Sequence, residues 1–104
     1  MKTLKTILFL GTLCAAVAEA NQEQNRFVGR VGVHNSSAYF SVQGELSTPC
    51  KFSIIYADLN IEFGKAAYSA LLLAKSSKTE LRRINYDFDA NTELCTLTLI
   101  ELNE

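Results

Sequence analysis

The sequence predicts a mainly β fold that contains one helix. Five segments have the alternating or β-branched and aromatic composition of strands, and one alanine- and leucine-rich segment lies between the third and fourth of them. Turn-forming residues separate these segments, and the chain has no internal repeat or low-complexity stretch. We therefore expect one small domain, which follows an export signal.

Residues 1–20 have the pattern of a secretory signal peptide. Lys2 and Lys5 supply a positive start, residues 7–17 are apolar, and residues 18–20 read Ala-Glu-Ala, an A-x-A cleavage site. We expect cleavage after residue 20. The mature chain, residues 21–104, is then an exported protein, either periplasmic or secreted.

The first two strands are predicted at residues 27–33 and 38–46. Residues 21–25 before them are polar and are expected to be a flexible lead-in. Residues 34–37, His-Asn-Ser-Ser, have the composition of a turn. The second strand alternates cleanly, which predicts a half-buried strand with Ala38, Phe40 and Val42 on one side and Tyr39, Ser41 and Gln43 on the other.

Three more strands are predicted at residues 51–57, 81–88 and 94–102. A Ser-Thr-Pro break at residues 47–49 precedes the first of these, and Asp-Ala-Asn at 89–91 forms a turn before the last. Within residues 81–88, apolar and polar side chains alternate. The Arg82-Arg83 doublet is interpreted there as one outward and one inward-leaning position rather than as a phosphate site.

The helix is predicted at residues 64–77. Ala67, Leu71 and Ala74 recur at i, i+4 and i+7, and alanine and leucine are strong helix formers. Asp or Asn within residues 58–60 is expected to cap its start. Because apolar side chains occupy more than one face, we expect the helix to plug or lie across a sheet over a wide arc.

The element order, three strands, a helix and two strands, is the order of the OB-fold. That fold is a small, five-stranded, partly open Greek-key barrel. The competing architecture is an α+β sheet with the helix packed on one face.

Cys50 and Cys95 are the two cysteines that remain after residue 20. Two cysteines in an exported chain predict a disulfide, here one that joins the start of the third strand to the start of the fifth. A catalytic thiol would need a base, and no motif ties the single histidine, His34, to either cysteine. Two cysteines and one histidine are too few for a zinc site, so no metal or cofactor is expected.

The charge balance disfavours nucleic acid as a partner. Without Lys2, Lys5 and Glu19, the 10 basic and 11 acidic residues become 8 and 10, a formal charge of −2. The apolar stretch at residues 7–17 is shorter than the roughly 20 residues that a membrane span needs. Asp87 and Asp89 are a conceivable carboxylate pair, but a solvated strand end is the default for them, so we expect no enzyme.

Three segments, VGRVGV, PCKFSIIY and AAYSALLLAK, together with a cysteine in the final strand, are familiar as a set. They resemble small exported proteins of Gram-negative bacteria that look like the receptor-binding B subunits of subtilase-type cytotoxins. The resemblance covers nearly all of residues 21–104. It implies an OB-fold and, for the toxin members, a ring of five subunits that binds cell-surface glycans. Its markers are structural, so it transfers no glycan-binding residue.

The usual binding surface of an OB-fold predicts the candidate site, which is the outer face of strands 2 and 3 with the neighbouring loops. An aromatic ring, amides and hydroxyls there would suit a sugar. The expected function is a non-enzymatic binding module for a glycan, and the alternative is a periplasmic interaction protein, such as an inhibitor or envelope accessory factor. The candidate ligand-binding residues are His34, Asn35, Ser36, Tyr39, Ser41 and Gln43.

Overall fold

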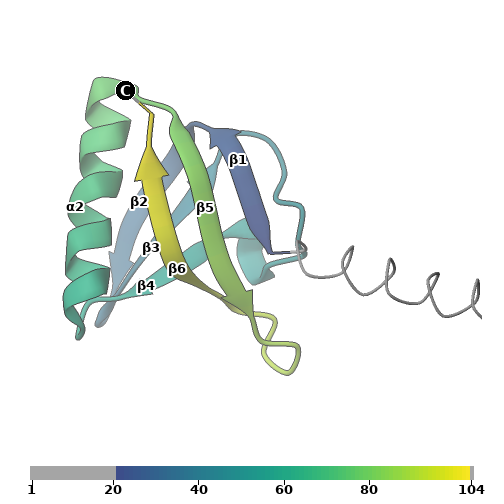
Figure 1. The fold of residues 1–104 in the computed structure, drawn as a ribbon. Helices are drawn as coiled ribbons and strands as arrows, with labels where there is room; N and C mark the ends of the chain where they lie inside the picture. The colour runs from purple at the N-terminus through teal and green to yellow at the C-terminus, as the bar shows by residue number, and fades with distance from the viewer. Residues whose placement is uncertain (1–20, 104) are drawn as a thin grey trace, which may run out of the picture.

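A computed structural model describes residues 21–103 of this chain, so the predicted signal peptide lies outside the described residues. The fold is mainly β with one α-helix (Figure 1). Its elements are β1 (Gln22–Arg26), β2 (Val28–His34), β3 (Ser37–Val42), the short 3₁₀ helix η1 (Lys51–Ser53), β4 (Ile55–Asp58), α2 (Glu62–Ser77), β5 (Leu81–Phe88) and β6 (Cys95–Leu102).

The strands form one six-stranded mixed sheet with the order β1-β5-β6-β4-β3-β2. Neighbours are antiparallel except β4 and β6, which are parallel. No ladder joins β1 to β2, so the sheet is open. It is not a closed barrel. The α+β alternative, a sheet with one packed helix, fits the pairing.

The prediction of a flexible lead-in at residues 21–25 is wrong, because residues 22–25 belong to β1. This strand pairs with β5 along the register from Gln22↔Asn85 to Arg26↔Leu81. Only Phe27 separates β1 from β2, which pairs with β3 on the opposite edge of the sheet. The predicted first strand is therefore the second half of a longer, broken segment, and a polar sequence concealed the first half.

Two other strand boundaries also differ from the prediction. β3 ends at Val42 rather than residue 46, since Gly44 turns the chain with a φ of 86°. The strand predicted at residues 51–57 begins only at Ile55, because Phe52 and Ser53 have left-handed φ angles of 61° and 57° and cannot continue a ladder. The last two strands are confirmed to within one residue.

Helix α2 is confirmed and begins two residues earlier than predicted. Its N-cap is Ile61, which makes no side-chain cap, so the predicted capping by Asp or Asn is wrong. Gly64 in its first turn lies against the backbone of Asp58, where an added Cβ would meet the Asp58 carbonyl oxygen at 1.7 Å. This close approach requires glycine. The helix buries one stripe rather than a wide arc, namely Gly64, Ala67, Leu71 and Ala74.

The core lies between α2 and the inner face of the curved sheet (Figure 1). The helix packs against β2, β3, β4 and β6. The largest fully buried side chains of this core come from both the strands and the helix. They are Phe40, Ile55, Leu71, Leu81, Ile84, Tyr86 and Cys95.

The predicted disulfide is present between Cys50 and Cys95, whose Cα atoms are 5.6 Å apart. Cys95 begins β6 as expected. Cys50, however, directly precedes η1 rather than a strand. The disulfide thus fixes the start of η1 to the sheet.

Candidate functional site

The outer face of β2, β3 and β4 carries a shallow depression with a volume of about 510 Å³. Outward-facing strand residues supply its floor, and η1 supplies one wall. Three of its seven lining side chains are aromatic, and the complete lining is Arg30, Val33, His34, Tyr39, Phe52, Ile54 and Tyr56. We call this surface the aromatic depression.

Tyr39 lies at its centre because the neighbouring strands leave room for the ring. Tyr39 pairs with Gly32 on β2 and with Tyr56 on β4. A Cβ added at Gly32 would lie 2.4 Å from the Tyr39 Cζ and hydroxyl oxygen, so the ring covers the glycine backbone. The rings of Tyr39 and Tyr56 have centroids 6.2 Å apart and planes tilted by 59°, an attractive edge-to-face type of arrangement.

Phe52 forms the wall from an unusual backbone conformation. It is 68% exposed and has a φ of 61°, a left-handed conformation that is disfavoured for a bulky residue. The Lys51 ammonium lies 5.4 Å from the Phe52 ring centroid, within the range of a cation–π contact. A large apolar ring held out to solvent by a strained backbone is a feature typical of ligand-contacting segments.

The polar members of the aromatic depression are Arg30 and His34, both exposed on β2. A guanidinium provides several hydrogen-bond donors, and an imidazole provides a donor and an acceptor. The lining contains no carboxylate. The arrangement can hold the flat apolar side of a ligand ring and bind hydroxyl or anionic groups at its edge.

Of the six predicted ligand-binding residues, the structure brings only His34 and Tyr39 into this depression. The other four have local structural contacts. Asn35 and Ser36 form the two-residue β2–β3 turn, in which Asn35 has a φ of 56° and the Ser36 carbonyl accepts from Leu59 N–H at 2.9 Å. Ser41 Oγ accepts a hydrogen bond from Arg30 N–H at 2.9 Å.

Gln43, the last of the six, is exposed and contacts Phe27 and Arg26 through its backbone, outside the aromatic depression. Its backbone N–H donates to the Phe27 carbonyl at 2.9 Å, and its own carbonyl accepts from Arg26. Of the carboxylate pair Asp87 and Asp89, Asp89 has a structural role. Its Oδ1 accepts a hydrogen bond from Asn91 N–H at 2.9 Å in the β5–β6 turn.

The sequence reasoning missed Arg30, Phe52 and Tyr56 as site residues. Tyr56 could have been found, because alternation through buried Ile55 and Ala57 places it outward, opposite Tyr39. Phe52 carried no such signal, since its exposure depends on the turn at η1. A second depression of about 430 Å³ adjoins the first at Tyr56 and extends the same outer face to β6, with Ser37, Tyr56, Asp58, Leu94 and Thr96 as its lining.

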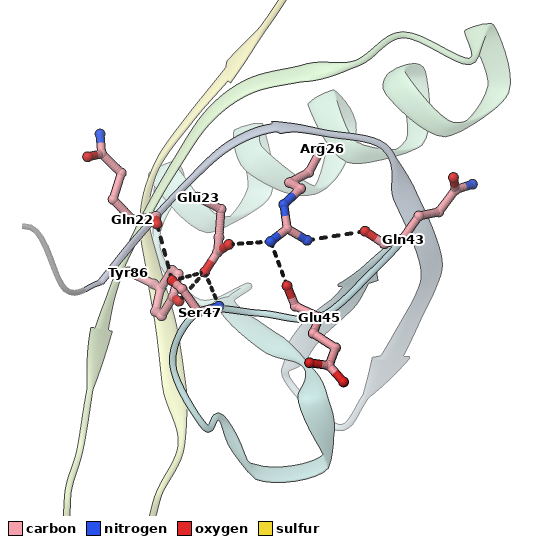
Figure 2. A network of polar contacts seen from close by, with 7 residues as sticks. All are labelled: Gln22, Glu23, Arg26, Gln43, Glu45, Ser47 and Tyr86. Carbon is pink, nitrogen blue, oxygen red and sulfur yellow. Dashed lines mark hydrogen bonds and ion pairs between the residues drawn. The ribbon is translucent and has the colours of Figure 1, made fainter.

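A buried carboxylate, Glu23 on β1, ties the loop after β3 to the sheet (Figure 2). Glu23 is 3% exposed. Its oxygens accept from the Tyr86 hydroxyl at 2.6 Å, from the Ser47 hydroxyl and N–H at 2.6 and 2.8 Å, and from Arg26 at 3.0 Å. Arg26 also donates to the carbonyls of Gln43 and Glu45. The carboxylate thus accepts four hydrogen bonds, three at Oε2 and one at Oε1, which offsets the cost of its burial.

The same network changes the chemistry of Tyr86. Burial of the phenol, together with its hydrogen bond to the Glu23 carboxylate, raises the pKa of Tyr86 above its ordinary value of 10.0. Tyr86 therefore stays a neutral donor to Glu23 throughout the neutral pH range.

Among residues 21–103, no His, Cys, Asp and Glu side chains gather in a group of three or more that could hold a metal ion. The helices of the same segment include none with the length and apolar character needed to cross a membrane. Comparison with known proteins gave no match to a protein-family model, to a curated protein or to a solved structure.

Proposed function

We propose that this chain is an exported, non-enzymatic binding module whose ligand is a glycan. One observation carries the proposal, namely the aromatic depression on the outer face of β2, β3 and β4. Tyr39, Tyr56 and Phe52 offer ring faces to the apolar side of a sugar ring, while Arg30 and His34 offer polar groups to its hydroxyls.

The volume of the depression supports a small ligand or one end of a larger one. Binding pockets for small molecules commonly measure roughly 300–1,000 Å³ and combine apolar walls with a few polar groups. The aromatic depression, at about 510 Å³, falls in that range. Its openness to solvent favours the end or side of an oligosaccharide that remains attached to a larger molecule.

The finer description of the fold belongs to this proposal. We infer a partly open OB-like arrangement in which β1 and β2 are two halves of one bent strand. The support is that only Phe27 separates them, while they pair with β5 and β3 on the two edges of the sheet. The resemblance to toxin B subunits adds a five-membered ring as the assembly to test, at a periplasmic or extracellular location.

A glycan array tests the proposal with the disulfide-bonded protein. We expect saturable binding to a restricted set of glycans, lost in Tyr39→Ala and reduced at least tenfold in Gly32→Ala, whose Cβ would displace the Tyr39 ring. Phe63→Ala is the matched control, because Phe63 is an exposed aromatic residue on α2, outside the lining of the depression. Absence of any glycan signal, or equal loss in the control, would contradict the proposal.

A second candidate function, an envelope interaction protein, is favoured by a different surface. Helix α2 leaves Leu72 and Leu73 43% and 59% exposed on the side away from its buried stripe. Exposed neighbouring leucines are a common feature of protein contacts. Light scattering on a sizing column separates the readings, since a mass near five chains supports the ring, whereas a monomer that captures one envelope protein through Leu72 and Leu73 supports the second.

A further inference from the structure

Strand β5 departs from regular alternation at Arg82. In a regular strand Leu81 and Arg83 would share one face, yet Leu81 is fully buried and Arg83 is half-exposed. The register against β6 shifts between these two residues, which identifies a β-bulge at Arg82. The bulge turns two consecutive arginines to the outer face, so the interpretation of one outward and one inward-leaning arginine is wrong.

Strand β1 departs from alternation at the same level of the sheet. Asn25 has a φ of 55°, and Gln24 and Asn25 are both exposed. Glu23 and Arg26, three residues apart, therefore meet on the inner side with N and O atoms 3.0 Å apart. Gln24 pairs with Arg83, so the two irregular segments are neighbours. Together with β6 they line a polar depression of about 430 Å³, and its lining is Gln24, Asn25, Arg82, Arg83 and Glu101. We call it the arginine depression.

The charges of this lining are unbalanced. Two guanidinium groups face one carboxylate, and the Arg83 Nε lies 3.8 Å from a Glu101 carboxylate oxygen, beyond hydrogen-bond distance. Within residues 21–103, the buried side-chain nitrogen and oxygen atoms without a hydrogen-bond partner are Arg83 Nε and Asn85 Oδ1. Both residues belong to the outward series of β5. Unpaired buried polar atoms are costly, so they indicate a place where a ligand group would be stabilising.

We propose that the arginine depression binds a small organic anion, a carboxylate or a phosphate monoester, that also carries a hydroxyl group. Guanidinium groups bind such anions through paired, charge-assisted hydrogen bonds, and Arg82 and the 43% exposed Arg83 side chain can supply them. The amides of Gln24 and Asn25 can add donors, and the Glu101 carboxylate can accept from the ligand hydroxyl. This site lies on strands other than those of the aromatic depression and does not depend on the glycan proposal.

Nuclear magnetic resonance titration of the disulfide-bonded protein at about 10 mM ionic strength, where screening is weak, tests the site. The probes are inorganic phosphate, acetate, glycerol 3-phosphate and lactate. We expect saturable shifts of the Arg83 Nε–H signal and of the neighbouring backbone amides, with the two hydroxyl-bearing anions about tenfold tighter than their simple counterparts. Tighter binding of glycerol 3-phosphate assigns a phosphate ligand, and tighter binding of lactate assigns a carboxylate.

Four variants make the test specific. Arg82→Gln and Arg83→Gln should each weaken binding at least tenfold, whereas Lys65→Gln, which removes an exposed cation from α2, outside both depressions, should not. Glu101→Ala should tighten inorganic phosphate, because a repulsive charge is removed, and should abolish the preference for hydroxyl-bearing anions, because the acceptor is lost. The proposal is overturned if chloride at equal ionic strength produces the same shifts, or if Lys65→Gln weakens binding as much as Arg83→Gln.

Discussion

The two outer surfaces of this sheet were built in opposite ways. The aromatic depression lies where β3 and β4 alternate regularly, so that Tyr39 and Tyr56 face outward together. The arginine depression lies where β1 and β5 break alternation, at Asn25 and Arg82. The comparison teaches that a strand can present a ring by following its two-residue period, and can gather two neighbouring charges on one face only by interrupting it.

Removal of the disulfide should have the largest effect and should separate the two surfaces. Closure of a 45-residue loop stabilises the fold by about 4 kcal/mol in the chain-entropy description, so we expect a loss of that size in Cys50→Ala/Cys95→Ala. Urea unfolding measures it. In the molecules that stay folded, amide shifts should concentrate at η1, next to the aromatic depression, because ladders hold the arginine depression. Equal changes on both surfaces would contradict this difference.

Loss of the buried Glu23 carboxylate should destabilise the part of the sheet that carries the arginine depression. Glu23→Ala leaves Arg26, Ser47 and Tyr86 without their shared acceptor, and we expect a destabilisation of about 3 kcal/mol. The adjacent Gln24→Ala, on the exposed face of the same strand, is the control and should change the unfolding free energy by less than about 0.5 kcal/mol. Similar urea midpoints for the two variants would show that the network contributes little.

Strand β1 loses its regular alternation at Asn25, and the stability of this irregularity should depend on the left-handed backbone of that residue. Asn25→Ala is expected to cost about 1 kcal/mol, because alanine lacks the short polar side chain that lets asparagine tolerate this conformation, whereas Asn25→Gly should be close to neutral. Thermal unfolding compares the pair. Equal stability of the two variants would mean that the φ of residue 25 does not hold β1 in place.

Substitutions at Phe52 should abolish glycan binding without lowering the stability of the fold. Phe52→Gly relieves a left-handed backbone, so stability should stay the same or rise by up to about 1 kcal/mol, while glycan binding is lost. Phe52→Ala keeps the unfavourable φ and should lose binding with no gain in stability. Calorimetry on both variants, with the array hit as ligand, tests this, and a clear destabilisation of Phe52→Gly would show that the ring is structural.

The smallest effect is expected at alkaline pH. The folded-state pKa of Tyr86 is raised, so the neutral phenol contributes stability below the unfolded value of about 10, and that contribution declines as pH rises through the folded-state pKa. Urea midpoints from pH 8 to 11 measure the decline. In Tyr86→Phe the decline should be shallower, and parallel curves for the two proteins would contradict the assignment.

Features set by local composition were predictable from the sequence. Alternation in β3 and the period of α2 located Tyr39 and the helix, and the cysteine count located the disulfide. Features set by pairing partners were not predictable. Residues 22–26 have no apolar side chain, and their strand conformation depends on the ladder with β5 and on the donors around Glu23.

The residues of the candidate site show the same difference between what local pattern predicts and what it does not. Tyr39 was predicted from the outer face of a strand and His34 from the loop beside it, whereas Phe52 is exposed through two left-handed residues that no periodicity reveals. Gln43 was expected to bind a ligand with its side chain, but its backbone groups hold Phe27 and Arg26. A polar residue on the correct face of a strand can therefore be structural when the chain turns immediately after it.

The backbone of Asn25 links the inside of the molecule to its surface. Its left-handed conformation lies between Arg26, which pairs with buried Glu23, and Gln24, which lies opposite Arg83 on the exposed face. Substitutions at these positions should consequently be epistatic, so that a change tolerated at Arg83 depends on the residue at Glu23, even though the two occupy opposite faces. Among homologous sequences, the two faces should covary through this one position, and a library that randomises only the surface residues would underestimate what the site can accept.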